Sequence, residues 1–263
     1  MDNDNKTGGK GLSTDEFIHQ LMTKLKTRPD STPPYRSLLI FSTPRSGSTY
    51  YSDVLSSAGQ IGECREWFNF RYMKAYCNIF QLQDLNFDKY LEFIRAKTSN
   101  NTGTFAVNMH IDQYRQLKQQ GIDVLGLSFD LVIYLERAEK IAQAVSLAKA
   151  SLSDQWSDFL RPARELPESI PHSLITGSLA KIQESQEFFE NNLRPHCDFH
   201  FIYEDFTSQD NLKYFERPLE KLGLNMPLEN LHTQLSKQAD QHSEKLIEEY
   251  KQALFNSYQE SRP

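Results

Sequence analysis

The stretch that decides the fold of this 263-residue chain is Leu38 to Tyr51, LLIFSTPRSGSTYY. It begins with a short continuous apolar run, which is typical of a buried strand in a parallel sheet. A Gly/Ser turn follows at Pro44 to Thr49, and a helical pattern then runs through Tyr50 and Tyr51 to Gly59. The first N–H groups of such a helix have no intrahelical acceptor, and the helix dipole favours an anion there. The stretch therefore predicts an anion-binding loop.

The side chains of the loop suit a phosphate or a sulfate group. Arg45 carries a permanent charge and a planar fork of donors. Gly47 allows an anion to approach the backbone closely, and the hydroxyl groups of Ser46, Ser48 and Thr49 add donors. The alternative is a plain strand–helix turn capped by serines. The GxxxxGK[ST] spacing of a Walker loop and an Asp-rich strand for magnesium are absent, which argues against a nucleotide or sugar kinase.

The rest of the chain alternates between strand and helix patterns. We expect strands at 37–41, 104–110, 129–135 and 200–203. Such alternation predicts an α/β fold in which a central parallel sheet is flanked by helices. The expected helices that follow the first strand span 50–59, 87–97, 112–119, 139–150, 174–192, 212–222 and 243–258.

Two regions are expected along the chain. Residues 1–34 form an N-terminal extension, partly disordered, in which Ser13 and Glu16 match a capping box at the start of one short helix. Residues 35–263 are expected to fold as a single domain, which is common for α/β enzymes of this length.

Composition narrows the class of protein. The formal net charge of −6 argues against broad attraction to nucleic acid or to an anionic membrane. No apolar run is long enough to cross a bilayer, and Met1 to Lys10 lack the apolar core of a secretory signal. The three cysteines have no CxxC or Cys/His ligand spacing, so we expect free thiols, no metal and a cytoplasmic location.

Several segments beyond the loop occur in an order that is typical of one enzyme family. PRSGST (44–49) after a buried strand resembles the 5′-phosphosulfate loop of sulfotransferases that use PAPS (3′-phosphoadenosine 5′-phosphosulfate). From about Leu38 to Tyr250 the chain resembles the bacterial trehalose 2-sulfotransferase family, which implies a P-loop-like sulfotransferase fold. The supporting segments are GECREWF (62–68), YLERAEKIAQAVSLAKA (134–150), YEDF (203–206) and KQAD (237–240).

The resemblance implies further contacts to the donor nucleotide. In the family, an Arg and a Ser at the spacing of Arg137 and Ser146 hold the 3′-phosphate. Lys237 and Gln238 are expected to fold over the nucleotide, although the family commonly has Arg where this chain has Lys, so bidentate geometry is lost. The alternatives are a surface Arg, a helix-facing Ser and a solvated turn. PAPS would be the co-substrate and PAP (3′-phosphoadenosine 5′-phosphate) the product.

Glu66 is the predicted general base because it matches the base position of the family. Trp67 and Phe68 should desolvate its carboxylate, raise its pKa, and offer a flat wall to an acceptor. Glu63 ranks second. His110, at the end of a predicted strand, is the runner-up base or a donor to the acceptor. The alternatives are an ordinary surface Glu and a satisfied, partly buried His.

Three other features are given alternative or structural roles. Many family members carry Lys where this chain has Asn108, which puts a charge contact there in doubt. Trp156 matches a recurrent Trp that lines the nucleotide or acceptor site or closes the core. The segment 203–206 is expected to be architectural despite its two carboxylates.

Together these patterns predict an enzyme that transfers a sulfuryl group from PAPS to a hydroxyl of a small-molecule acceptor, expected to be a sugar. Glu66 deprotonates the acceptor, and Arg45 stabilises the leaving PAP in an in-line displacement. One alternative is sulfation of a hydroxyl or nitrogen of a non-carbohydrate natural product. Another is a non-catalytic PAP- or phosphate-binding module. A homodimer is suggested only by the resemblance and by the helix expected at 174–192.

Overall fold

The computed structural model describes residues 11–31, 33, 36–157, 160–225 and 240–260. It contains two compact units, which are described separately. The expectation of a single domain over residues 35–263 stays a prediction. The sheet unit comprises Ile18–Ala138 and Glu187–Gln234, and the helical unit comprises Met1–Phe17, Glu139–Gln186 and Leu235–Pro263.

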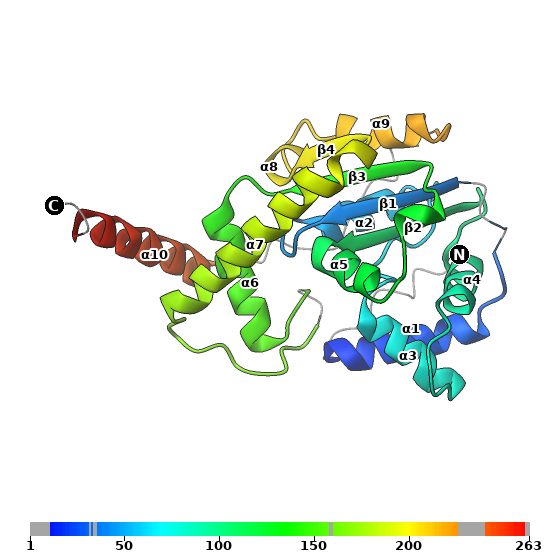
Figure 1. The fold of residues 1–263 in the computed structure, drawn as a ribbon, viewed down its shortest axis with the longest axis horizontal. Coiled ribbons are helices and arrows are strands. Elements are labelled where there is room, and N and C mark those ends of the chain that lie inside the picture. Colours follow the sequence, from blue (N-terminus) through cyan, green and yellow to red (C-terminus); the bar gives the residue numbers. More distant parts are fainter. Residues whose placement is uncertain (1–10, 32, 34–35, 158–159, 226–239, 261–263) are drawn as a thin grey trace. The chain divides into compact units, whose positions relative to one another are not determined.

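A four-stranded parallel sheet forms the centre of the sheet unit (Figure 1). The strand order is β2-β1-β3-β4, so the expected α/β fold with a central parallel sheet is confirmed. The expected start of the third strand at Phe129 was wrong, because the Asp130 carboxylate instead accepts a hydrogen bond from the Ser37 N–H at 2.7 Å. The strands are β1 (Arg36–Ser42), β2 (Thr104–His110), β3 (Leu131–Glu136) and β4 (Phe199–Ile202).

Helices cover both faces of this sheet. The expected helices of the sheet unit are present, and α3 and α8 are additional to them. Asn69 begins α3, since its side chain accepts a hydrogen bond from the Arg71 N–H at 2.9 Å. The helices are the larger part of α1 (Thr14–Thr27), α2 (Ser48–Ser57), α3 (Phe70–Phe80), α4 (Phe87–Thr98), α5 (Ile111–Gln119), the end of α7 (His172–Asn192), α8 (Tyr203–Phe206), α9 (Lys213–Lys221), and the short 3₁₀ helices Leu125–Leu127 and Arg194–His196.

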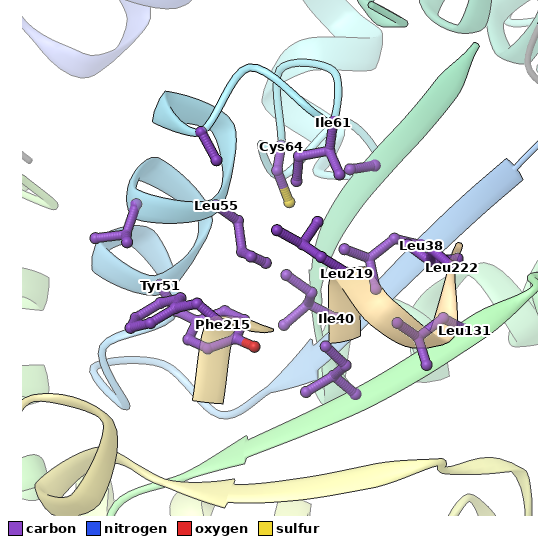
Figure 2. Packing of buried hydrophobic residues seen from close by; sticks show 14 of the residues in the cluster. Leu38, Ile40, Tyr51, Leu55, Ile61, Cys64, Leu131, Phe215, Leu219 and Leu222 are labelled. Atoms are coloured by element: carbon purple, nitrogen blue, oxygen red, sulfur yellow. The ribbon is translucent and has the colours of Figure 1, made fainter. Parts of the chain in front are cut away.

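Burial of both faces explains the continuous apolar run of β1. Leu38 and Ile40 pack with side chains of α2 and α9 in one cluster (Figure 2). On the opposite face, Phe41 meets the ring of Tyr114 from α5 edge to face, with centroids 5.5 Å apart. Full burial of each such side chain stabilises the fold by about 1.5–3 kcal/mol. Polar side chains enter β1 only at its ends, and the carboxyl end is where the candidate site lies.

In the part of the chain that the structure describes, the helical unit is built mainly of helices. Its core contains Val145 of α6 (Lys140–Ser153), Ile182 of α7 and Leu246 of α10 (Gln241–Glu260). Lys149 joins α6 to the start of α10, because its ammonium group lies 2.9 Å from Asp240 Oδ1. The capping box expected in the N-terminal extension is confirmed by a 2.7 Å hydrogen bond from the Ser13 N–H to Glu16 Oε2. None of the helices within the described residues has the length and apolarity needed to cross a membrane.

Gly62 gives a test of the backbone route that leads from α2 toward the site. A Cβ at this position would overlap the carbonyl oxygen of Thr98 and lie 2.8 Å from that of Thr104, and backbone cannot move aside cheaply. We expect Gly62→Ala to lower the free energy of unfolding by about 1–3 kcal/mol, measured by urea denaturation. Gly177→Ala is the control, because its Cβ meets nothing within 4 Å, and it should be neutral or stabilising by up to about 1 kcal/mol. Equal unfolding midpoints for the two variants would contradict this account.

Candidate active site

The carboxyl ends of β1 and β3 bring two arginines together. In the strand order β2-β1-β3-β4, the strand that follows β1 along the chain is β2, on one side of β1, whereas β3 and then β4 lie on its other side. The direction of the strand order therefore reverses between β1 and β3. Parallel sheets bind ligands beyond the strand ends at such a reversal. Arg45 follows β1 and Arg137 follows β3, and Arg137 Nη1 donates a hydrogen bond to the Arg45 carbonyl oxygen at 3.5 Å. The sheet topology thus places both predicted cations where an anionic ligand would bind.

The loop after β1 has an unusual backbone. Arg45 has φ 64° and Gly47 has φ 82°, so two residues in three lie in the left-handed region. For a non-glycine residue this costs about 1–3 kcal/mol, and such backbone clusters at binding sites. Gly47 is also the N-cap of α2 and has no side chain to cap the first amides of the helix. The loop therefore leaves those amides for an anion.

The loop hydroxyl groups differ in their surroundings. Ser46 is fully buried, and its Oγ has no hydrogen-bond partner within the described part of the chain. A buried hydroxyl without a partner costs about 1–3 kcal/mol, which an anion at this loop would offset by accepting from it. Ser48 is also buried, whereas Thr49 is exposed. The residues of the loop thus fit a bound phosphate or sulfate group.

Tyr203 and Glu204 support Arg137 and the loop at Gly47. A Cβ on Gly47 would overlap the Tyr203 ring, lying 2.8 Å from Cε2, so only glycine fits against this ring. The Arg137 guanidinium lies 4.8 Å from the centroid of the same ring. Glu204 accepts a hydrogen bond from the Ala138 N–H at 2.9 Å, and its other carboxylate oxygen lies 3.8 Å from Arg137 Nε. The segment 203–206 is therefore architectural, as expected, and it is placed directly behind the site.

The chain beyond α2 returns along the free edge of β2. Arg65 pairs with Val107 in an isolated parallel bridge, and the Asn108 N–H donates to the Arg65 carbonyl oxygen at 2.9 Å. This pairing sets Glu66 beside His110 at the carboxyl end of β2. The distance from Glu66 Oε1 to His110 Nε2 is 3.3 Å. The structure thus brings the predicted base and the runner-up base into one pair.

Both oxygens of the Glu66 carboxylate have partners. Oε1 faces His110, and Oε2 accepts hydrogen bonds from Gln113 Nε2 at 2.8 Å and from Asn69 Nδ2 at 3.0 Å. The Glu66 side chain is 26% exposed and that of His110 is 12% exposed. The carboxylate is therefore held in one orientation while solvent still reaches it.

The expected rise in the pKa of Glu66 was wrong. Burial alone would raise this pKa, but the charge of His110 and the hydrogen bonds from His110, Asn69 and Gln113 outweigh burial and lower the pKa to about 2. For His110, burial alone would lower the pKa, but the charge and hydrogen bond of Glu66, with a contribution from Asp112, raise it. The resting pair is therefore a carboxylate and an imidazolium.

The rings of Trp67 and Phe68 pack into the core. Both are fully buried. The Trp67 indole N–H donates to the Glu63 carbonyl oxygen at 2.8 Å, and its ring meets Tyr72 edge to face. The Glu63 carboxylate is engaged elsewhere, 2.7 Å from Arg28 Nη2. The two aromatic residues thus anchor the segment that carries Glu66.

The comparisons with known proteins identify the family. The Stf0 sulphotransferase model matches residues 37–253. The chain belongs to the Stf0 sulfotransferase family. This membership supports sulfuryl transfer as the reaction. No curated protein matches the chain.

Two solved structures resemble this Stf0 sulfotransferase at 15% sequence identity. One is the sulfotransferase domain from the curacin biosynthetic pathway, with a TM-score of 0.46, covering 81% of this chain and 83% of that chain. The other is the sulfotransferase domain from the Synechococcus PCC 7002 olefin synthase, with a TM-score of 0.42, covering 86% of this chain and 98% of that chain.

Two further predicted residues of this Stf0 sulfotransferase, Ser146 and Trp156, lie in the helical unit. Ser146 is half-buried on α6 of the helical unit. Trp156 packs against the core of that unit, and its indole N–H donates to Asp154 Oδ1 at 2.7 Å. Lys237 and Gln238 lie outside the described residues. Among the described residues there is no cluster of His, Cys, Asp and Glu that could hold a metal ion.

The Glu66–His110 pair predicts a pH window of stability. The pKa of Glu66 is lowered from 4.5, so its contribution is complete above pH 4.5 and is lost toward pH 2. The pKa of His110 is raised from 6.5, so its contribution is complete below pH 6.5 and is lost as the pH rises further. A double-mutant cycle with Glu66→Gln and His110→Asn, measured by urea denaturation, should give a coupling of roughly 0.5–3 kcal/mol between pH 4.5 and 6.5. A coupling that is the same at pH 9 as at pH 5.5 would refute the ion pair.

Proposed function

We propose that this chain transfers a sulfuryl group from PAPS to a hydroxyl of a small-molecule acceptor by in-line displacement. The observation that carries the proposal is the buried Ser46 hydroxyl, which has no partner within the described part of the chain and lies in the left-handed loop at the start of α2. Family membership supports sulfuryl transfer. The assignment of PAPS as donor rests on the fit of an anion to this loop.

The donor would be held at both ends. Its 5′-phosphosulfate accepts hydrogen bonds from the Ser46 hydroxyl and the first amides of α2, beside the charge of Arg45, with Gly47, Ser48 and Thr49 completing the loop. We assign the 3′-phosphate to Arg137, whose guanidinium is fixed against Tyr203 and Glu204. The further contacts proposed for this phosphate are Ser146, Lys237 and Gln238.

In the reaction, the acceptor oxygen forms a bond to sulfur while the bond between sulfur and the phosphate oxygen breaks. The acceptor hydroxyl loses its proton to the Glu66 carboxylate, which is the more exposed member of the pair. PAP departs with the bridging oxygen, and its growing negative charge is stabilised by Arg45 and the loop amides. The residues of the site thus supply positioning, a proton acceptor and a positive field.

Glu66 and His110 accept the proton as a unit. A lone carboxylate with a pKa of about 2 is a weak base at neutral pH. When His110 has lost its proton, however, the pair can take one proton from the acceptor, and the imidazole then shares it with the carboxylate. Turnover should therefore rise with pH as the resting pair loses its proton, through a pKa above 6.5.

A sugar remains the proposed acceptor, and its alternative is a hydroxyl or nitrogen of a non-carbohydrate natural product. The packing of Trp67 and Phe68 favours support of the base over contact with an acceptor. A cytoplasmic location and a homodimer remain proposals that rest on the sequence.

Arg45→Ala tests the donor site. Loss of this charged contact should weaken PAP binding by about 2–5 kcal/mol, measured by isothermal titration calorimetry. Arg217→Ala is a matched control, because Arg217 on α9 lies over the Phe199 ring, at the opposite end of the sheet from the loop. Unchanged PAP affinity in Arg45→Ala would remove the central claim.

Glu66→Gln tests the base. The substitution keeps size and hydrogen bonding but removes proton affinity, so turnover should fall by roughly 10²–10⁴-fold while PAP affinity stays unchanged. His110→Asn should cost less, and Glu63→Gln is the control, since Glu63 pairs with Arg28. The assay uses sulfate-labelled PAPS and a panel of sugars, other alcohols, phenols and amines.

The outcomes separate the alternatives. A larger loss in His110→Asn than in Glu66→Gln would exchange the roles of the two residues. An effect confined to Glu63→Gln would move the base to that position. PAP binding without turnover on any acceptor would favour the non-catalytic module. Turnover only on phenols or amines would replace the sugar as the acceptor class.

A further inference from the structure

A chain of hydrogen bonds continues from the Glu66–His110 pair into the interior of the sheet. Ser42, the last residue of β1, lies opposite His110 in the register of β1 and β2. Its Oγ is 2.9 Å from His110 Nδ1 and 3.2 Å from Asn108 Oδ1. Because Asn108 is two residues before His110 on β2, both side chains lie on the same face of the sheet. The order of groups is Asn108, Ser42, His110 and Glu66.

The two ends of this chain determine where its protons lie. The Oδ1 atom of Asn108 can only accept, so the Ser42 hydroxyl donates its one proton to it. The oxygen lone pairs of Ser42 then face His110 Nδ1, which must carry a proton to bond with them. At the other end, the Glu66 carboxylate can only accept, so His110 Nε2 also carries a proton. Each of the three contacts pairs a donor with an acceptor when His110 is an imidazolium.

We propose that Ser42 and Asn108 are positioning residues that stabilise the doubly protonated state of His110 and thereby strengthen the Glu66–His110 pair as a proton acceptor. The catalytic part of this inference rests on the function proposed above. The protonation state itself does not, because it follows from the contacts of the four side chains.

Burial of Ser42 and Asn108 makes their hydrogen bonds favour the imidazolium form of His110. Ser42 is fully buried and Asn108 is 2% exposed, so water does not replace either hydrogen bond. Hydrogen bonds to a charged group strengthen in such surroundings. The charged groups that act on the imidazole are Glu66, from the segment after α2, and Asp112, from the first turn of α5, and both favour the imidazolium.

The chain of hydrogen bonds also gives Ser42 a place in the proposed reaction. Ser42 directly precedes the segment that leads into the Arg45 loop, so the end of β1 carries both this loop and the side chain that contacts His110 from the interior of the sheet. The proton that leaves the acceptor enters a pair whose protonated form Ser42 and Asn108 stabilise. Their loss should therefore weaken the base without disturbing donor binding.

Nuclear magnetic resonance of the ring nitrogens tests the protonation state directly. In ¹⁵N-histidine-labelled protein without ligand at pH 6.5, both ring nitrogens of His110 should be protonated, and His110→Asn assigns the signals among the seven histidines. Ser42→Ala removes the hydroxyl acceptor for Nδ1–H and keeps the Ser42 backbone, which also raises the pKa of His110, so this pKa should fall only part of the way to that of an unpaired ring. Asn108→Leu should lower it too, because the freed Ser42 hydroxyl can then donate to a bare Nδ1.

Activity provides the second readout. In Ser42→Ala, the rising limb of the pH profile of kcat should move to lower pH, and its plateau should fall about tenfold, with the KM for PAPS unchanged. Ser42→Thr keeps the hydroxyl and should restore both. Ser37→Ala is the matched control, because it removes a hydroxyl from the start of the same strand, where Ser37 bonds Asp130.

Two results would overturn the proposal. One is a His110 ring with a single protonated nitrogen in the wild type at pH 6.5. The other is a His110 pKa in Ser42→Ala that equals that in Ser37→Ala. If the chain shows no sulfuryl transfer but His110 is doubly protonated and depends on Ser42, the proposed function fails and the positioning roles stand. If transfer occurs but Ser42 does not affect His110, the positioning roles fail and the proposed function stands.

Discussion

The parallel pairing of β1 with both of its neighbours is the constraint on which the rest of the structure depends. Because the three strands run in the same direction and end at nearly the same level, everything that follows them meets at one edge. Arg45 therefore meets Arg137, and Ser42 lies opposite His110. Any slip of β1 by one residue would turn Ser42 to the other face and break the chain to Asn108.

The same pairing of the strands places the two arginines and the Glu66 carboxylate in different parts of the candidate site. The two arginines lie beyond β1 and β3, where we propose that the anionic donor binds, while the carboxylate of Glu66 lies at the edge of β2. A base next to the arginines would form an ion pair with them and lose its proton affinity. Instead Glu66 is paired with His110, and in the proposed reaction the loss of the His110 proton makes the pair a base. Ser42 stands between the two regions on the shared strand.

Much of the fold could be predicted from the sequence because its signals are local. The apolar run of β1, the Gly/Ser turn and the capping box of Ser13 and Glu16 depend on residues close in the chain, and the structure has each of them. The helix α3 was not predicted, although Asn69 is a good N-cap and the buried Tyr72 and Tyr76 lie one helical turn apart. The start of β3 was misplaced because Ser37, distant in sequence, engages Asp130.

The sequence by itself determined the sheet, the loop after β1 and the residue types of the candidate site, since periodicity and turn chemistry depend on consecutive residues. Only the tertiary structure decided the electrostatics. The pKa of Glu66 moved opposite to expectation because its decisive neighbour, His110, is 44 positions away in the chain and reaches it through the edge of β2. Likewise, Tyr203 supports Gly47 only because β4 ends beside the loop. Contacts between residues far apart in the sequence determine both the pKa values and the packing of the loop. A local sequence pattern does not show which distant residues make these contacts.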